Sequence, residues 1–394
     1  MNAKSSQRRS ASPSVRLAVA AACAAAASSA WAQQPAGAAS GVATAGDPLE
    51  EIVITGTRRE GTTVATSARP VDIVSGEALG EQGAINLNDA LRTQVVSLNV
   101  QQFVAQDGSA FVRPFTLRGL PPDQTLVLVN GKRRHRSALV QITNQPLSAG
   151  AQGPDLATIP SIAVEQVEVL RDGASAQYGS DAIAGVINFR LKRASEGATV
   201  IAQAGEFMDG GGAGYTLQGN IGLPLTSEGF FNLSAEYADS DPTSRGTQRP
   251  DAQALIDAGN TAVPVPAQRW GNVPVEAARL FFNAELPATD AVTAYAFGSY
   301  SWSQGDTEFF YRNPVTRTDI FTSVPLTSTP GGPRFNFNEW FPGGFTPLFG
   351  TSIEDMSLAA GAKGATGAGL EYDFGFGMAE SEVDYRMSNT VNPS

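Results

Sequence analysis

Cysteine and histidine are almost absent from this chain of 394 residues, which contains one of each. The cysteine is Cys23, in an apolar segment near the N-terminus, and the histidine is His135. A disulfide framework and a zinc site built from histidine and cysteine need more of these side chains than the chain has. Cys23 lies in a leader that we expect to be removed, so the mature chain would have no thiol chemistry either. We therefore expect no cofactor.

Acidic residues are absent from the first 46 residues, which carry four basic ones. An apolar run follows and ends in Ala30-Trp31-Ala32. A basic start, a short apolar core and a small-residue site are typical of a secretory signal peptide. We expect this peptide to occupy residues 1–32, with cleavage between Ala32 and Gln33. Residues 33–49 consist largely of small and polar residues and predict a flexible linker.

Beyond this leader, no apolar stretch reaches the about 20 residues that a membrane helix needs. A membrane protein of this composition would have to be a β-barrel. Charge is also uneven, because residues 47–195 hold 15 acids and 14 bases, whereas residues 196–394 hold 23 acids and 9 bases. The change predicts a domain boundary near Ser195. The acidic second half argues against nucleic acid as a partner.

Residues 60–195 have the pattern of a compact α+β domain. We expect a short helix to begin near Asn88 and another over residues 174–178. Apolar runs predict strands over residues 115–120, 125–129, 164–170 and 185–191. The dipeptide Asn130-Gly131 favours a tight turn. Positive φ angles or a close approach of the backbone are expected at four glycines, namely Gly119, Gly131, Gly173 and Gly179.

From residue 197 onward, apolar and polar residues alternate along segments of about ten residues, as in transmembrane β-barrels. We expect seven strands joined by six connectors. The third and fifth connectors are long (residues 240–277 and 304–352) and the others are short. Bacterial barrels have short periplasmic turns and long outer loops, so this parity fits a barrel. The apolar phase changes near Glu380, which predicts a bulge or a membrane boundary there.

Five stretches, in this order, carry a resemblance to a known family. They are Glu-Ile-Val-Ile-Thr-Gly-Thr-Arg-Arg at 51–59, Leu-Arg-Gly at 117–119, Val-Leu-Val-Asn-Gly at 127–131, Val-Glu-Val-Leu-Arg-Asp-Gly at 167–173 and Ser-Ala-Gln-Tyr-Gly-Ser-Asp-Ala-Ile-Ala-Gly-Val-Ile-Asn at 175–188. The chain resembles the TonB-dependent outer-membrane receptors. The resemblance implies an α+β plug domain over 60–195, followed over 196–394 by part of an antiparallel transmembrane β-barrel. About seven of an expected ~22 strands are present, and an odd number cannot close, so we expect an N-terminal fragment.

The resemblance also implies roles for individual residues. Residues 50–59 would contain a TonB box that pairs with TonB by strand addition, although this run could also be an ordinary first strand of the plug. The box residues are Glu51, Ile52, Val53, Ile54 and Thr55. The residues of the plug motif are Arg118, Gly119, Asn130, Gly131, Glu168, Arg171, Asp172, Gly173, Tyr178 and Gly179. Of these, Arg118 and Glu168 are expected to hold the plug to the barrel wall by ion pairs.

The implied function is active import of a scarce nutrient, a ferric siderophore in the first instance, across the outer membrane. Carbohydrate or vitamin B12 uptake are alternatives, and a passive porin-like channel is the alternative from a different class. An enzyme is not expected. The implied partners are TonB with its inner-membrane energising complex, outer-membrane lipid, and a small molecule such as a metal chelate. The plug and N-terminus would lie on the periplasmic side.

Two further features are ambiguous. The basic run from Lys132 to Arg136 could suggest a nucleic-acid patch, but its position after the Asn-Gly turn favours a solvated or barrel-facing hairpin edge. The loop over residues 304–352 is rich in aromatic residues. Trp340 and Phe341 are candidates for ligand capture by stacking. Packing of the loops against each other is an equally good explanation.

Overall fold

The computed structural model describes residues 71–391 except 82–86, 105–106, 114, 143–148, 172–174 and 328–329. The predicted signal peptide, its cleavage site, the linker and the TonB box lie outside these residues, as do Asp172 and Gly173. Two large sheets organise the described chain, one of five strands and one of seven. Among the described residues, no helix is long and apolar enough to cross a membrane.

The five-stranded sheet forms the centre of the smaller domain, in the order β1-β6-β7-β4-β5. Its strands are β1 (Val71–Ser75), β4 (Thr125–Val129), β5 (Lys132–Arg133), β6 (Val164–Leu170) and β7 (Gly185–Leu191). Strands β4 and β7 are parallel, whereas the other pairs are antiparallel. Around this sheet lie α2 (Gly76–Gly80), α3 (Leu87–Gln94), α5 (Ser175–Tyr178), the pair β2 (Leu98–Val100) and β3 (Phe115–Leu117), and the 3₁₀ turns η1 (Asp107–Ala110), η2 (Pro122–Gln124), η3 (Leu156–Thr158) and η4 (Ser161–Ala163).

The central strands of this sheet are covered on both faces. Val127, Ile187 and Phe189 belong to the main apolar cluster, whereas Leu126 and Val186 belong to a second cluster on the opposite face. A strand that is buried on both sides cannot alternate apolar and polar residues. This explains why β4 appears in the sequence as a continuous apolar run.

The sequence predictions for this domain are largely confirmed. Strands β4, β6 and β7 have the predicted bounds, and the two short helices are α3 and α5. The strand predicted over 115–120 is wrong at its end, since β3 stops at Leu117. Arg118 and Gly119 then have φ angles of 58° and 76°, and an extended strand cannot continue through two such residues.

The seven-stranded sheet, which we call the wall, confirms the predicted number of strands. Its order is sequential, and every neighbouring pair is antiparallel. The strands are β8 (Ala198–Gly205), β9 (Gly214–Pro224), β10 (Phe230–Ser240), β11 (Val275–Thr289), β12 (Val292–Glu308), β15 (Leu348–Ala365) and β16 (Glu371–Ser388).

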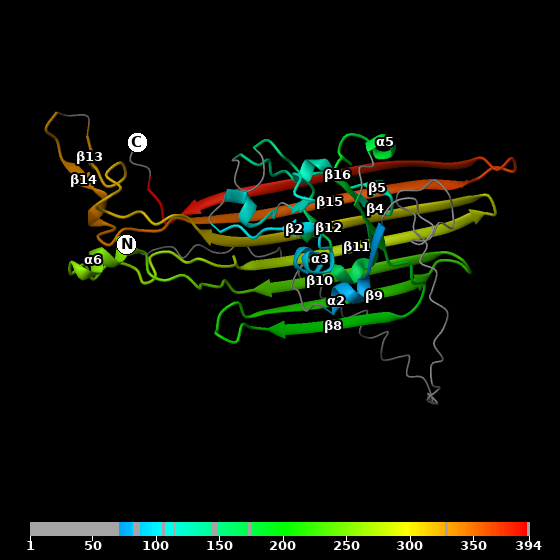
Figure 1. Cartoon of the computed structure of the whole chain (residues 1–394), viewed down its shortest axis with the longest axis horizontal. Coiled ribbons are helices and arrows are strands. Elements are labelled where there is room, and N and C mark those ends of the chain that lie inside the picture. The colour runs from blue at the N-terminus through cyan, green and yellow to red at the C-terminus, as the bar shows by residue number, and fades with distance from the viewer. Residues whose placement is uncertain are drawn as a thin grey trace.

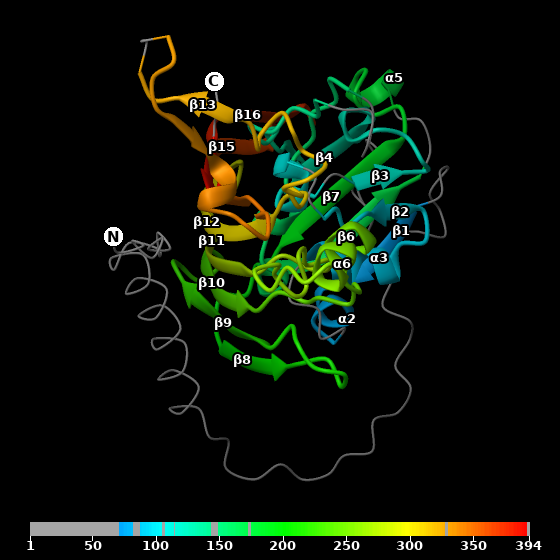
Figure 2. The same cartoon turned by 90° about the vertical axis from the view of Figure 1, so that its left-hand side faces the viewer.

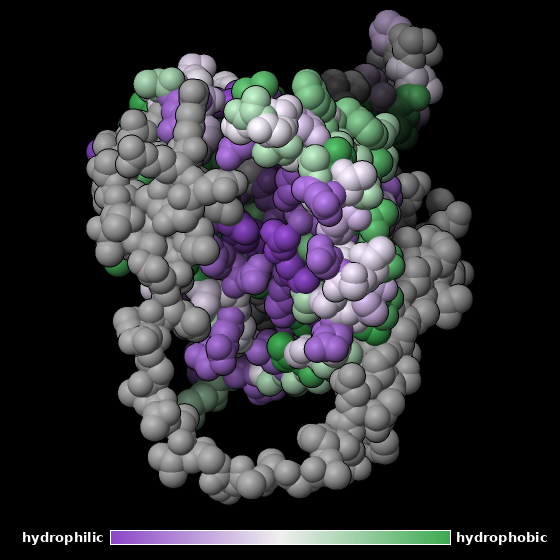
Figure 3. All heavy atoms as spheres, turned by 90° about the vertical axis from the view of Figure 1, so that its right-hand side faces the viewer, coloured by the Kyte–Doolittle hydropathy of each residue, from purple (hydrophilic) through white to green (hydrophobic). Residues whose placement is uncertain are grey.

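The wall curves around the smaller domain, which lies against its concave face (Figures 1 and 2). Side chains alternate between the two faces of each strand. Buried polar residues such as Asn220, Glu236 and Arg279 lie on the concave face, whereas exposed apolar residues such as Leu223 and Phe374 lie on the convex face. Viewed from the end that carries the short turns, hydrophilic residues gather in the middle (Figure 3).

The bulge considered near Glu380 is wrong, because β16 pairs with β15 without a register shift along its whole length. Instead, the residues on the convex face of β16 change from apolar to acidic along one regular strand. Phe374, Phe376 and Met378 are followed on this face by Glu380 and Glu382, and all five are exposed. The phase change therefore marks the border of an apolar band.

The two long connectors lie at one end of the wall, which we call the loop end; the opposite end is the turn end. Residues 241–274 include α6 (Pro250–Asp257), and residues 309–347 include β13 (Ser323–Pro325), β14 (Arg334–Asn336) and the 3₁₀ turn η5 (Phe337–Glu339). Hydrogen bonds join the two connectors, for example from Asn260 Nδ2 to the Pro342 carbonyl at 2.8 Å. The short pieces α6, β13 and β14 carried no clear periodicity in the sequence.

Gly185, at the start of β7, offers a test of the packing in the smaller domain. Its φ is 149°, and a Cβ there would meet the Leu170 carbonyl and would lie 2.8 Å from Leu117 Cδ2. We expect Gly185→Ala to lower the free energy of unfolding by about 1–3 kcal/mol or more. Gly80→Ala is the control, since a Cβ at Gly80 meets nothing within 4 Å. Thermal unfolding of the purified protein in detergent measures both, and equal melting temperatures would contradict this account.

Candidate functional site between the smaller domain and the wall

The predicted Asn130-Gly131 turn lies where the smaller domain meets the wall. It joins β4 to β5, and both residues have positive φ (48° and 76°), as a two-residue hairpin turn requires. The Asn130 side chain accepts from Leu191 N at 2.9 Å and donates to Asn283 Oδ1 of β11 at 3.1 Å. The turn is therefore fixed within its own domain and bound to the wall.

The predicted ion pair of Glu168 with the wall stays a prediction, and the contacts described for this residue lie within its own sheet. Its fully buried carboxylate accepts from Asn188 Nδ2 at 3.1 Å and Gln166 Nε2 at 3.0 Å, and lies 3.5 Å from Arg190 Nη1. These described partners all belong to β6 and β7, so the carboxylate joins two neighbouring strands. A buried carboxylate needs such donors close by, and the nearest ones are on its own sheet.

The predicted ion pair of Arg118 with the wall also stays a prediction. Its side chain is exposed and donates to the Arg171 carbonyl at 2.9 Å. Arg171 in turn pairs with Asp72 of β1 at 2.8 Å. Tyr178 accepts from Arg133 through its carbonyl, and Gly179 follows with a φ of 99°. Gly119 and Gly179 have the predicted positive φ, and these motif residues organise the smaller domain internally.

The strongest attachment to the wall is Arg134, directly after β5. Its guanidinium donates to Asp355 Oδ1 (2.5 Å), Ser357 Oγ (2.7 Å) and Ser299 Oγ (2.9 Å), all on the wall. It also donates to Thr158 Oγ1 of its own domain at 3.2 Å. The Arg134 and Asp355 side chains are each only 4% exposed. Removing one partner of such a buried pair typically costs about 3–5 kcal/mol.

The residues around Arg134 extend this attachment. His135 Nε2 lies 2.7 Å from the second oxygen of Asp355. Nearer the turn end, Lys132 Nζ pairs with Asp373 Oδ2 of β16 at 2.6 Å, and Arg193 pairs with Glu285 of β11 at 2.6 Å. The prediction that the basic run forms a barrel-facing hairpin edge is therefore confirmed at Lys132, Arg134 and His135.

A second buried acid, Asp155, lies beside this network. Burial raises the pKa of Asp155 to about 6, and the nearby Asp355 carboxylate acts in the same direction. The Ala157 amide, Arg279 and Arg134 oppose this shift. Arg279 itself pairs with Glu236 on the wall, and Gln218 Nε2 donates to the other oxygen of Glu236 at 2.5 Å. Around Asp155, the positive and negative side chains at the concave face are therefore nearly equal in number.

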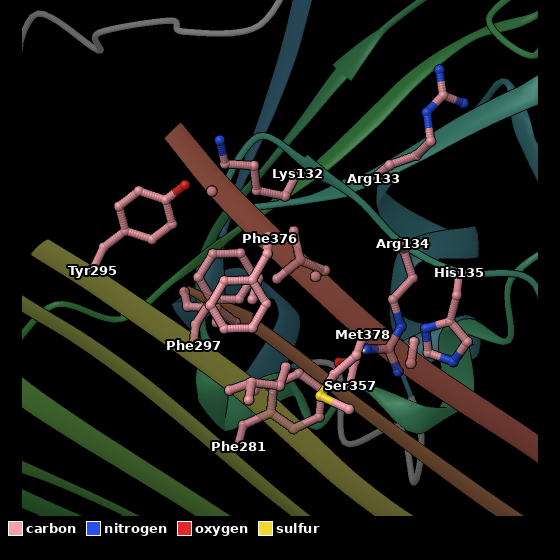
Figure 4. A pocket seen from close by; sticks show the side chains of 18 residues that line it. Lys132, Arg133, Arg134, His135, Phe281, Tyr295, Phe297, Ser357, Phe376 and Met378 are labelled. Atoms are coloured by element: carbon pink, nitrogen blue, oxygen red, sulfur yellow. Dashed lines mark hydrogen bonds between the residues drawn. The ribbon is translucent and has the colours of Figure 1, made fainter. Parts of the chain in front are cut away.

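Two cavities lie between the smaller domain and the wall. The first has a volume of about 400 Å³ and lies toward the turn end. Lys132 and Tyr295 lie on one side of it, and Arg134 and His135 on the other (Figure 4). The second, of about 270 Å³, lies toward the loop end and is lined by residues that include Arg113, Asp155, Ser303 and Thr351.

The aromatic loop packs largely against itself. Phe321, Phe337 and Phe345 are buried together, and the Phe341 ring lies 4.5 Å from that of Phe345. Trp340 differs, because it is 66% exposed although its ring lies 4.8 Å from that of Phe335. Phe341 therefore has a packing role, while Trp340 has a surface free for contact. Ligand capture by these residues stays a prediction.

Comparison with known proteins supports the resemblance that the sequence motifs indicate. Residues 63–186 match the family model of the TonB-dependent Receptor Plug Domain. The smaller domain is therefore a plug domain of the TonB-dependent receptor type, and the chain is similar to these receptors. It is similar to the vitamin B12 transporter BtuB of Vibrio cholerae, with 28% identity over 52% of this chain and 32% of that protein. It is also similar to the ferric enterobactin receptor PirA of Pseudomonas aeruginosa, with 32% identity over 44% of this chain and 24% of that protein.

Solved structures of TonB-dependent receptors share the fold. The ferric enterobactin receptor PfeA superposes with a TM-score of 0.52 and 19% identity, covering 78% of this chain and 41% of that structure. The chain thus spans less than half of the length of each of these three proteins. The smaller domain is the plug, and the wall is a set of antiparallel strands of a receptor barrel.

Sequence reasoning missed Arg134, Asp355, Lys132, Asp373 and Arg193 as individual contact residues. The basic run was visible, but its acidic partners lie 221 and 241 positions away along the chain. One signal was available: Asp355 and Asp373 are acids at alternating positions of predicted strands. An acid on the concave face of a receptor barrel wall needs a cation from the plug or from a neighbouring strand.

The raised pKa of Asp155 predicts how the stability of the protein changes with pH. The folded-state pKa of about 6 is above the unfolded value of 3.8, so the protonated side chain stabilises the folded state. This stabilisation is fully present below about pH 4. This contribution is lost as the pH rises through 6, and amounts to roughly 3 kcal/mol at about 1.4 kcal/mol for each pH unit between the two values.

We therefore expect Asp155→Asn to melt at a higher temperature than the wild type at pH 7.5, and at a similar temperature at pH 4.5. Thermal unfolding of the purified receptor in detergent at the two pH values measures this difference. A difference between the two proteins that does not change with pH would refute the raised pKa.

Proposed function

We propose that the full-length receptor imports a scarce nutrient across the outer membrane by a TonB-dependent mechanism, with the plug as its gate. The observation that carries this proposal is that the plug lies against the concave face of the barrel wall and is attached there by buried polar contacts. The Arg134–Asp355 pair is the clearest of these. A plug attached in this way closes the barrel until work is done on it.

The need for work separates an energised importer from a passive channel. Withdrawing Arg134 from the wall leaves the Asp355 carboxylate buried with one cation fewer, which is expensive in a low-dielectric interior. Thermal motion alone would rarely supply this free energy. A pull on residues 51–55, offered as a strand to TonB, supplies the missing energy in this proposal. The porin-like alternative has no role for that segment.

The transported ligand is proposed from the relatives alone. Two of them are named as ferric enterobactin receptors and one as a vitamin B12 transporter. We propose a ferric siderophore as the first ligand to test, with vitamin B12 second and carbohydrate third. In this arrangement the loop end faces the outside, and the plug and the N-terminus face the periplasm.

Deletion of residues 51–55 tests the coupling. In the full-length receptor, expressed in a strain without its chromosomal copy, we expect this deletion to abolish uptake while leaving ligand binding to cells unchanged. The physical reason is that binding uses the outer surface, whereas release of the plug needs the pull. Uptake of radiolabelled ferric enterobactin and of cyanocobalamin gives the readout. A deletion strain that still accumulates whichever ligand the wild type takes up would favour a passive channel.

Trp340 and Phe341 can be separated by substitution. We expect Trp340→Ala to weaken ligand binding to whole cells about tenfold, the change that roughly 1.4 kcal/mol produces, without affecting melting of the receptor. Phe341→Ala should lower the melting temperature, because its ring packs against Phe345. Equal binding by Trp340→Ala and wild-type receptors would rule out ligand capture by this residue.

A further inference from the structure

The two cavities beside the plug are separated by one polar layer. The larger cavity is lined by Arg134, His135 and Ser357, and the smaller one by Asp155, Thr158 and Ser301. Thr158 accepts from the Arg134 guanidinium, and Ser301 pairs in register with Asp355. Arg134 and Ser357 thus border the larger cavity, and Thr158 borders the smaller one.

This layer is about one side chain thick. A single guanidinium bridges from the plug to Ser299 of β12 and to Asp355 and Ser357 of β15. The two serines also lie within hydrogen-bond distance of each other, 2.7 Å apart. Above and below the layer, the same two strands line both cavities: Ser303 and Ile353 toward the loop end, Phe297 and Ala359 toward the turn end.

The lining of the larger cavity is suited to passage. On β15 and β16 it includes the small residues Ala359, Gly375 and Gly377 beside the larger Leu358, Phe376 and Met378. The Tyr295 ring fits against this surface, since a Cβ at either Gly361 or Gly375 would collide with its hydroxyl. Small residues on a concave wall leave room that a larger side chain would fill.

We propose that the two cavities are the two halves of one substrate passage, which runs along β12 and β15 between plug and wall and is closed by the guanidinium of Arg134. This proposal rests on the proposed import function and specifies where the substrate moves. The passage opens when the plug hairpin of β4 and β5 withdraws Arg134 from Asp355.

His135 makes this opening easier. It contacts the second oxygen of Asp355 from the side of the larger cavity, and its side chain is 18% exposed, against 4% for Arg134. When Arg134 leaves, the imidazole can keep a hydrogen bond to the carboxylate while water enters from the cavity. Asp355 is then not left without a partner in a dry interior, which is the costly outcome for a buried charge.

The first experiment measures leakage without TonB. Purified full-length receptor is reconstituted into liposomes, and swelling is followed with arabinose as the permeating probe. We expect Arg134→Ala to raise the swelling rate by about tenfold or more, since loss of one partner of a buried ion pair exceeds the ~1.4 kcal/mol that tenfold represents.

The matched control is Arg92→Ala. Arg92 is another plug arginine, but it is exposed in the last turn of α3 and lines neither cavity. This variant should swell liposomes at the wild-type rate. An Arg134→Ala receptor that is no leakier than Arg92→Ala would overturn the proposal. If Arg134→Ala cannot be recovered folded, Asp355→Asn removes the same pair from the side of the wall.

The second experiment locates the leak. Ala359 lines the larger cavity, whereas its neighbour Ala360 lies on the opposite, convex face of β15. In the Arg134→Ala background, Ala359→Trp should return swelling to near the wild-type rate, whereas Ala360→Trp should leave it high. Equal leakage of the two double variants would place the path elsewhere. Since neither experiment uses TonB or residues 51–55, failure here is distinct from failure of the proposed import function.

Discussion

An arginine removed from water must find acceptors for its N–H groups, and Arg134 finds them on two separate bodies. Thr158 belongs to the plug, whereas Ser299, Ser357 and Asp355 belong to the barrel wall. Neither body alone satisfies the guanidinium. The position of the plug hairpin, the register of β12 against β15 and the presence of cavities on both sides are all consistent with this one requirement.

The wall accommodates this requirement through the two-residue alternation of its strands. One face of β15 carries Asp355 and Ser357 toward the plug, while the other carries Met356 and Leu358. A slip of one residue between β12 and β15 would turn Asp355 toward the convex, apolar face. The buried pair therefore specifies register as well as attachment, which is a role for which buried polar groups are well suited.

Much of this fold could be predicted from the sequence because its signals are local. The bounds of β6 and β7, the Asn130-Gly131 hairpin and the seven wall strands follow from apolar periodicity and turn residues. The end of β3 could not be predicted, because an arginine with a φ of 58° has no local signature. Positions of α6, β13 and β14 depend on contacts between the long loops, which lie far apart in sequence.

The site was less predictable, for the reason that its partners are distant. The motif residue Glu168 seemed suited to the wall, yet its donors Asn188 and Arg190 are on the neighbouring strand. The basic run at 132–136 was placed on a barrel-facing edge, but sequence alone could not distinguish Arg134, which is buried, from Arg133, which is exposed. Only the β5 pairing and the turn before it decide which side chain faces the wall.

The topology of the plug determines how a pull could reach the Arg134 network. Strand β1 lies at one edge of the sheet, whereas β5 and Arg134 lie at the opposite edge, with β6, β7 and β4 between them. These three strands are the most deeply buried part of the plug, and the Glu168 carboxylate joins β6 to β7. β1 contributes only five residues, paired on one side. A pull that merely peels β1 away leaves Arg134 in place, so opening at Arg134 requires the central strands to move together as one body.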